Sequence, residues 1–84
     1  MENIFAIYKN INMEDLTRLK NFGINLKCER LRASMSQEKL AELTDLSRNF
    51  ISMVETGKIN PTILKVVDIA RALNIDINNL LRNI

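Results

Sequence analysis

The hydrophobic positions of this chain recur mostly at three- and four-residue spacings, the period of amphipathic helices. The pattern is clearest between residues 35 and 60, where apolar residues fall on either side of one break. This arrangement predicts two short helices that pack along a shared apolar seam. The expected seam residues are Leu40, Ala41, Thr44, Leu46, Ile51 and Val54.

Polar residues and a glycine mark the ends of these two helices. Ser36 and Ser47 each stand just before a helical run, where a side-chain oxygen can accept a hydrogen bond from a free backbone N–H. Gly57 follows the second run and is expected to end it. Asp45 falls in the intervening turn, and Asp tolerates the left-handed backbone better than most residues do.

The same period predicts helices before and after this pair. One spans residues 13–33, with an expected weak point near residues 21–23 because Gly23 and Asn25 are poor helix formers. Another follows Thr62 as its N-cap and ends at Asn74, and Asp76 caps a last helix over residues 77–82. Their expected buried residues are Leu16, Leu19, Phe22, Leu26 and Leu31 in the first, and Ile63, Leu64, Val66, Val67, Ala70 and Leu73 in the second.

Together these elements predict an all-α domain of five helices over residues 13–84. With two Gly and one Pro in 84 residues, the chain has few turn residues for a strand-rich fold. Residues 1–12 are interpreted as an N-terminal arm, whose apolar residues fit either a helical turn or a short strand. We expect the arm to pack on the domain or to be partly disordered; the alternative is that its apolar residues help to close a dimer.

The formal net charge is only +2, but the charges are unevenly distributed. Residues 16–34 carry five basic side chains against one acidic, and residues 47–65 carry three against one. Residues 1–15 and 35–46 are acidic instead. A folded chain with this distribution can present one basic face, which is the electrostatic footprint of a nucleic-acid-binding protein.

Several classes of protein are disfavoured by the composition. One cysteine, Cys28, cannot form an intrachain disulfide, and with no histidine a structural zinc site is excluded. The chain offers no nucleophile with an adjacent base, so we expect no catalytic residues, metal or cofactor and no enzyme activity. Without a membrane-spanning run or a signal peptide, a cytoplasmic protein is expected.

From about residue 22 to residue 81, the sequence resembles the Cro/C1-type helix-turn-helix regulators, also called the XRE family. The resemblance implies a compact, lambda-repressor-like DNA-binding domain with its helix-turn-helix at about residues 36–56. Asp45 departs from the family pattern, which usually has Gly in the turn. The matching residues are Ser36, Gln37, Glu38, Leu40, Ala41, Glu42, Leu46, Ser47, Arg48, Ile51, Ser52, Glu55, Gly57 and Pro61.

Double-stranded DNA is the partner that this resemblance implies. Arg48 and Asn49 open the recognition helix, and these side chains can bind guanine and adenine edges bidentately in the major groove. The resemblance also implies that Gln37 contacts a DNA phosphate and braces the recognition helix. It further implies an ion pair between Arg30 and Glu55 that ties the first helix to the recognition helix. The full expected DNA-binding set is Gln37, Ser47, Arg48, Asn49, Ser52, Met53, Lys58, Asn60 and Lys27.

The last predicted helix carries more apolar surface than a short terminal helix usually hides. Ile77, Leu80, Leu81 and Ile84 are therefore expected at a dimer interface, with completion of the monomer core as the alternative. The sequence thus predicts a transcriptional regulator that binds a palindromic operator as a homodimer, either a restriction–modification controller or a Cro-like repressor. The alternative function is an antitoxin that binds both a toxin protein and its own promoter.

Overall fold

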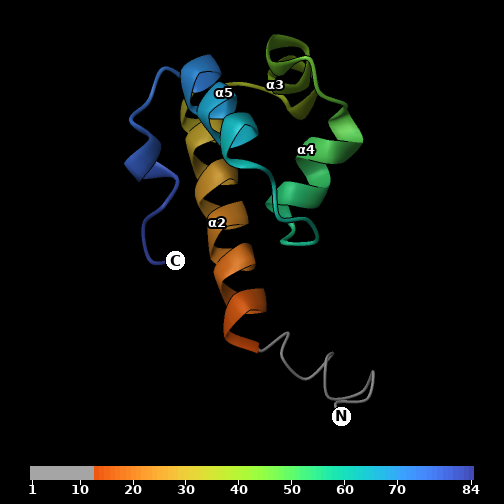
Figure 1. Ribbon diagram of the computed structural model, residues 1–84. Coiled ribbons are helices and arrows are strands. Elements are labelled where there is room, and N and C mark those ends of the chain that lie inside the picture. The colour runs from red at the N-terminus through yellow and green to blue at the C-terminus, as the bar shows by residue number, and fades with distance from the viewer. Residues whose placement is uncertain (1–12) are drawn as a thin grey trace.

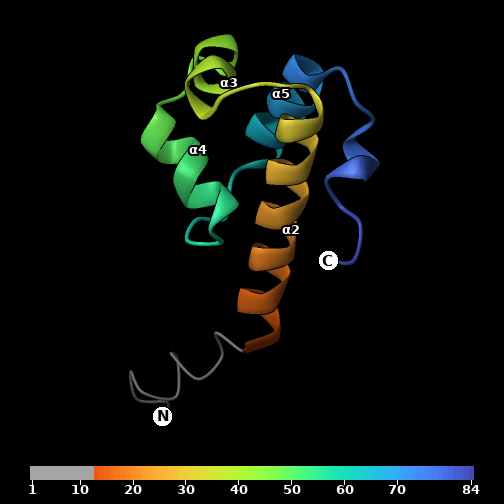
Figure 2. The ribbon, with the colours of Figure 1, turned by 180° about the vertical axis from the view of Figure 1, so that it is seen from behind.

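The computed structural model describes residues 13–84. Four α-helices, α2 (Met13–Arg32), α3 (Gln37–Thr44), α4 (Arg48–Glu55) and α5 (Ile63–Leu73), precede a 3-10 helix, η1 (Ile77–Asn79). The long α2 runs the length of the domain, with α3 and α4 on one side of it and the C-terminal segment, residues 80–84, on the other (Figures 1 and 2). The expected all-α class is confirmed for these residues. The predicted arm, residues 1–12, lies outside the described residues.

One hydrophobic core joins all four α-helices and the C-terminal segment. It forms because the apolar stripes of the helices face one another, and Leu26, Leu40, Ile51 and Ile69 are completely buried. The core consists of Phe22, Leu26, Leu40, Ala41, Ile51, Val54, Val66, Ile69, Ala70, Leu73 and Leu80.

Most of the helix ends follow the local signals of the sequence. The hydroxyls of Ser36 and Ser47 accept hydrogen bonds from the backbone N–H three residues later, at 3.0 and 2.9 Å. Asp45 and Asn74 adopt the left-handed conformation after α3 and α5, with φ of 55° and 53°, and Gly57 does so after α4 with φ of 73°. These predicted caps and stops are confirmed. Thr62 precedes α5 as expected, but its side chain makes no capping hydrogen bond.

The first helix is continuous, so the weak point predicted near residues 21–23 does not break it. Gly23 is buried where α2 meets α4. The Asn25 amide is occupied by hydrogen bonds to the C-terminal segment. Both residues that weaken the isolated helix therefore make tertiary contacts that hold it in place.

The prediction of five helices is wrong for the described residues, which form four α-helices and one 3-10 turn. In place of a helix over residues 77–82, η1 ends at Asn79. The Asp76 carboxylate caps this turn by accepting from the Asn78 N–H at 2.8 Å, as predicted. Beyond it, the carbonyls of Leu80, Arg82, Asn83 and Ile84 accept hydrogen bonds from side chains of α2, and these contacts hold residues 80–84 in a non-helical course.

A row of polar side chains on α2 holds this C-terminal segment, residues 80–84. The Asn25 amide donates to the carbonyls of Leu80 and Arg82 at 2.9 and 2.7 Å. The Arg18 Nε donates to the carbonyl of Ile84 at 2.7 Å. Because the row falls at helical spacing, it forms a continuous strip along one face of α2. Its members are Arg18, Asn21, Asn25 and Glu29.

Four residues predicted to be buried are exposed instead. Ile63 and Leu64 are 64% and 72% exposed, because the core-facing side of α5 begins at Val66 and the first turn is not covered by the described residues. In α2, Leu16 and Leu31 are also exposed. The domain therefore displays apolar side chains that its own core does not use.

Candidate nucleic-acid interface

The two central helices form a helix-turn-helix. The left-handed Asp45 reverses the chain after α3, and the Leu46 N–H then donates to the carbonyl of Ala41 at 2.9 Å. Leu46 is half-buried and packs against the core, which anchors the turn between the two helices. The orientation of α4 relative to α3 is thus set by both the turn and the core.

The N-terminal turn of α4 presents the two residues predicted to read bases. Arg48 and Asn49 are both exposed, while the hydroxyl of the preceding Ser47 is engaged as the helix cap. Arg48 also has a protein partner, because its Nε lies 2.9 Å from Oε1 of Glu38 in the first turn of α3. The remaining guanidinium donors extend from a surface where the helix N-terminus adds positive potential.

The other predicted DNA-binding residues lie around α4. Ser52 and Met53 are half-buried on α4 itself. Lys58 and Asn60 are exposed in the loop after α4, and Lys27 is exposed on α2. Lys27 is one helical turn beyond Gly23, the residue at which α2 contacts the end of α4.

One basic residue near this surface was not singled out from the sequence. The backbone of Lys20 packs against Gly57, so closely that a Cβ atom on this glycine would lie 2.9 Å from the Cα of Lys20. Lys20 is exposed and sits beside the loop that carries Lys58. Its position seven residues before Lys27, on the same face of α2, was the available signal.

A buried network braces the end of α4 against α2 and α3. Arg30 Nε and Nη2 donate to the two carboxylate oxygens of Glu55 at 2.6 and 3.1 Å, and their side chains are only 8% and 3% exposed. Gln37 Nε2 donates to Glu55 Oε1 at 3.0 Å, and Arg30 Nη1 donates to the Met35 carbonyl at 2.8 Å. The hydrogen bond to Glu55 raises the pKa of Arg30, although burial acts in the opposite direction. The network therefore fixes the end of α4 through a bidentate, charge-assisted contact.

A second contact holds α4 from the side of α5. The Lys65 ammonium lies 4.9 Å from the centroid of the Phe50 ring, within the range of a cation–π interaction. Phe50 is half-buried against the core. The recognition helix is thus held by α2, α3 and α5 together.

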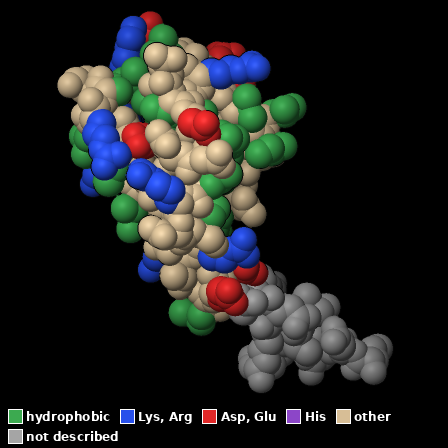
Figure 3. Space-filling view, turned by 90° about the vertical axis from the view of Figure 1, so that its left-hand side faces the viewer, with side chains coloured by type: hydrophobic (Ala, Val, Ile, Leu, Met, Phe, Trp, Pro, Cys, Tyr) green, Lys and Arg blue, Asp and Glu red, His purple; other side chains and the backbone are tan. Residues whose placement is uncertain are grey.

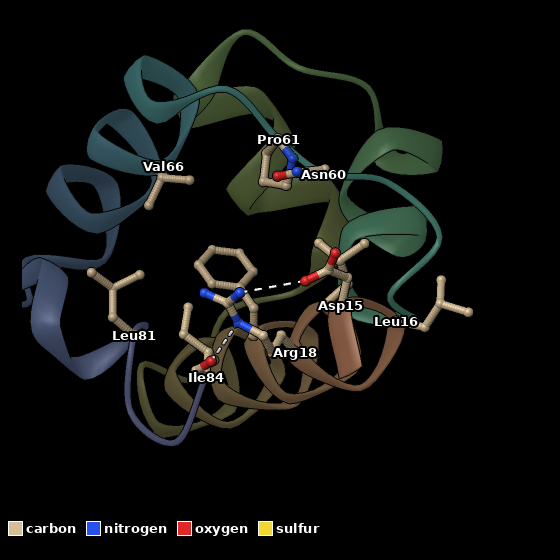
Figure 4. Close-up of a pocket in the computed structure, with 10 residues that line it drawn as sticks. Asp15, Leu16, Arg18, Asn60, Pro61, Val66, Leu81 and Ile84 are labelled. Atoms are coloured by element: carbon tan, nitrogen blue, oxygen red, sulfur yellow. Dashed lines mark hydrogen bonds and ion pairs between the residues drawn. The ribbon is translucent and has the colours of Figure 1, made fainter. Parts of the chain in front are cut away.

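The residues predicted at a dimer interface separate into two groups. Leu80 is fully buried in the subunit core, and Ile77 is half-buried against it, so both complete the monomer instead of facing a partner. Leu81 and Ile84 are each 37% exposed. They form one wall of a pocket of about 480 Å³ whose other walls come from α2, the loop before α5, and α5 (Figure 4). Its lining residues are Asp15, Leu16, Arg18, Leu19, Phe22, Asn60, Pro61, Val66, Leu81 and Ile84.

Within residues 13–84, no cluster of His, Cys, Asp and Glu could hold a metal ion. In the same residues, every buried side-chain nitrogen or oxygen atom has a hydrogen-bond partner. Cys28 is exposed on α2. No helix among the described residues has the length and apolar character to cross a membrane.

A braced helix-turn-helix with an exposed Arg-Asn pair at the start of its second helix defines a DNA-binding domain of the helix-turn-helix class. Comparison with protein families agrees, because the HTH_3 helix-turn-helix family matches residues 26–80. The chain belongs to this XRE-type family of transcriptional regulators. The resemblance noted from the sequence is confirmed.

One relative is named a control protein and another a restriction–modification controller protein. The chain is 37% identical over 57 residues to control protein C.SmaI of Serratia marcescens, and the match covers 68% of each chain. It is also similar to the crystal structure of the controller protein C.AhdI of Aeromonas hydrophila, with a TM-score of 0.74 and 34% identity. That match covers 76% of this chain and 97% of C.AhdI.

A further solved structure shares the fold but belongs to a longer chain. An HTH_3 family transcriptional regulator from Vibrio cholerae matches with a TM-score of 0.75 and 26% identity over 82% of this chain and 39% of its own. None of the relatives named here is described as an antitoxin, so that alternative gains no support.

Proposed function

We propose that this chain regulates a restriction–modification system by binding a palindromic operator as a homodimer. The observation that carries the proposal is the exposed Arg48–Asn49 pair at the N-terminal turn of a helix that is braced from three sides. The choice of system rests on likeness to C.SmaI and C.AhdI, which are named as control or controller proteins.

On DNA, α4 enters the major groove. Arg48 then contacts guanine O6 and N7, and Asn49 contacts adenine N6 and N7. Ser47, Ser52 and Met53 lie next to these residues along α4 and contact base edges or phosphate. The remaining residues bind the sugar–phosphate backbone and fix the register of α4. They are Gln37 at the first turn of α3, together with Lys27, Lys58 and Asn60.

The homodimer forms through the apolar surface that the described fold leaves uncovered. Ile63 and Leu64 protrude from the first turn of α5. This turn begins two residues after Pro61, which lines the same pocket as Leu81 and Ile84. The face with the C-terminal segment shows hydrophobic side chains along one edge (Figure 3). This segment and α4 lie on opposite sides of α2 (Figures 1 and 2), so a partner placed there leaves α4 free for DNA.

A dimer also meets an energetic need of the proposed function. One recognition helix reads only a few base pairs, whereas two helices about 34 Å apart read two half-sites on one face of the duplex. The exposed aliphatic side chains of α5 supply the apolar area that such an association requires.

The test is selection of duplexes from a randomised pool by the purified protein, followed by light scattering of the free protein and of the complex. A palindromic consensus with two subunits per duplex supports the proposal. Enrichment of no sequence, or one subunit per duplex, contradicts it. Methyltransferase and nuclease genes beside this one, with the consensus in the shared promoter, would establish the restriction–modification role.

A further inference from the structure

Glu38 in α3 makes a contact that neither the helix-turn-helix fold nor the core requires. Its Oε1 lies 2.9 Å from Nε of Arg48, the first residue of α4, and both side chains are 65% exposed. The pair therefore bridges the two helices at the surface proposed to face DNA. An exposed pair of this kind adds little to the stability of the fold.

The atoms involved determine what the pair leaves available. A guanidinium group has five N–H donors in a fixed planar fork, and Glu38 engages the Nε edge. The two terminal nitrogens remain free to make a bidentate contact with guanine O6 and N7. A long side chain that is otherwise free to rotate is thus held with one particular edge outward.

We propose that Glu38 is a positioning residue that sets the base preference of Arg48, an inference that rests on the proposed function. A carboxylate at a DNA-facing surface repels phosphates and weakens binding to every sequence. At the correct base pair this cost is offset, because the guanidinium is already oriented and loses less side-chain conformational entropy when it binds guanine. Exclusion of water in the complex also strengthens the contact between Glu38 and Arg48.

A simpler role for Glu38 makes different predictions. An acidic residue in the first turn of α3 interacts favourably with the helix N-terminus. If that were its only role, its removal would lower the stability of the domain and change the affinity for all sequences by the same factor. If Glu38 positions Arg48, its removal instead changes the preference at one base pair of the consensus. It then lowers the affinity for the selected duplex and raises the affinity for random duplex.

The experiment repeats the selection from a randomised pool with wild type, Glu38→Ala, Glu38→Gln and Arg48→Ala. We expect Glu38→Ala and Arg48→Ala to lose preference at the same base pair, while the other positions keep theirs. For Glu38→Ala, affinity for random duplex should rise, and the ratio of selected to random affinity should fall about tenfold. Glu38→Gln keeps an acceptor for Arg48 and should show an intermediate loss.

Glu42→Gln is the matched control. Glu42 is also an exposed acid of α3, but it pairs with Lys39 of its own helix at 3.8 Å. Its loss removes the same charge, so it should tighten binding to selected and random duplexes equally and leave the consensus unchanged. Circular dichroism verifies that each variant is folded, and if Glu38→Ala is not, Glu38→Gln carries the test.

The remaining outcomes overturn the inference in distinguishable ways. A full wild-type consensus for folded Glu38→Ala would show that Glu38 does not position Arg48. Loss at a different base pair from that lost in Arg48→Ala would mean that Glu38 reads a base directly. If wild-type protein enriches no sequence at all, the proposed function itself fails and this inference fails with it.

Discussion

Gly23 of α2 lies directly against the carbonyl group of Val54 in the last turn of α4. A Cβ atom at Gly23 would be 2.5 Å from that carbonyl oxygen, and closer still to the carbonyl oxygen of Glu55. Glycine therefore serves here for close approach of two helices. The contact places the end of α4 beside Arg30, which lies about two helical turns further along the same face of α2. It therefore contributes to the position of the recognition helix.

Gly23→Ala should consequently destabilise the domain, although Ala normally favours a helix. The added methyl group meets backbone atoms that cannot rotate away, and overpacking of this kind costs about 1–3 kcal/mol. We expect a lower urea midpoint and weaker operator binding. Cys28→Ala, at an exposed position of the same helix, serves as the control and should stay near wild type. A Gly23→Ala protein at least as stable as wild type would contradict the close contact.

The features that the sequence predicted well are those set by neighbouring residues. Ser36, Ser47, Asp45 and Asn74 act on backbone within four residues of themselves, so their roles followed from local rules. The Arg30–Glu55 contact, which spans 25 positions, was expected only because the chain resembles a family with this pair. Local chemistry alone does not specify such a partner.

The features that were missed depend on where a segment lies in three dimensions. The last helix was predicted from its apolar spacing, but side chains of α2, chiefly Asn25, hold residues 80–84 in a non-helical course. Ile63 fits the helical period of the core residues of α5 and is nevertheless exposed. The period shows which face of a helix is apolar, but it does not show how far along the helix other parts of the fold cover that face. The contact of Glu38 with Arg48 joins two exposed side chains ten positions apart, for which no sequence signal was available.

Loss of the Glu55 charge should be one of the most damaging single changes. In Glu55→Gln, the buried Arg30 guanidinium keeps its charge without a carboxylate partner, which typically costs about 3–5 kcal/mol. Urea unfolding followed by circular dichroism measures this loss. Retention of the wild-type midpoint would show that Arg30 is not buried as described.

A double variant separates the contribution of this pair to the stability of the domain from its effect on the position of α4. In Arg30→Met with Glu55→Met, the unpaired charge is absent, and apolar replacements of buried pairs are often close to neutral in stability. We expect the urea midpoint to recover relative to Glu55→Gln. Operator affinity should stay low, because Gln37 also loses its partner on α4.

The two kinds of DNA contact should differ in their response to substitution. Arg48→Ala should cost about 1–3 kcal/mol on the operator and relax the preference at one base pair, because a base contact carries sequence information. Lys58→Ala should weaken operator and random duplexes alike and reduce the salt dependence of binding, because a phosphate contact releases counterions. Fluorescence anisotropy over a range of salt concentrations measures both effects. Equal losses on both duplexes for both variants would contradict the division of roles.

Leu64→Glu should convert the proposed homodimer to a folded monomer. Leu64 is 72% exposed in the first turn of α5, so a charge there has little effect on the core but opposes burial against a partner. Sedimentation equilibrium should show the loss of association, with unchanged helical content. Operator affinity should then fall steeply and binding should become second order in protein, because each half-site must be filled separately. The control is Leu31→Glu, at a position 57% exposed on α2, which should remain dimeric. A dimeric Leu64→Glu protein would exclude the first turn of α5 from the interface and leave Leu81 and Ile84 as the exposed candidates.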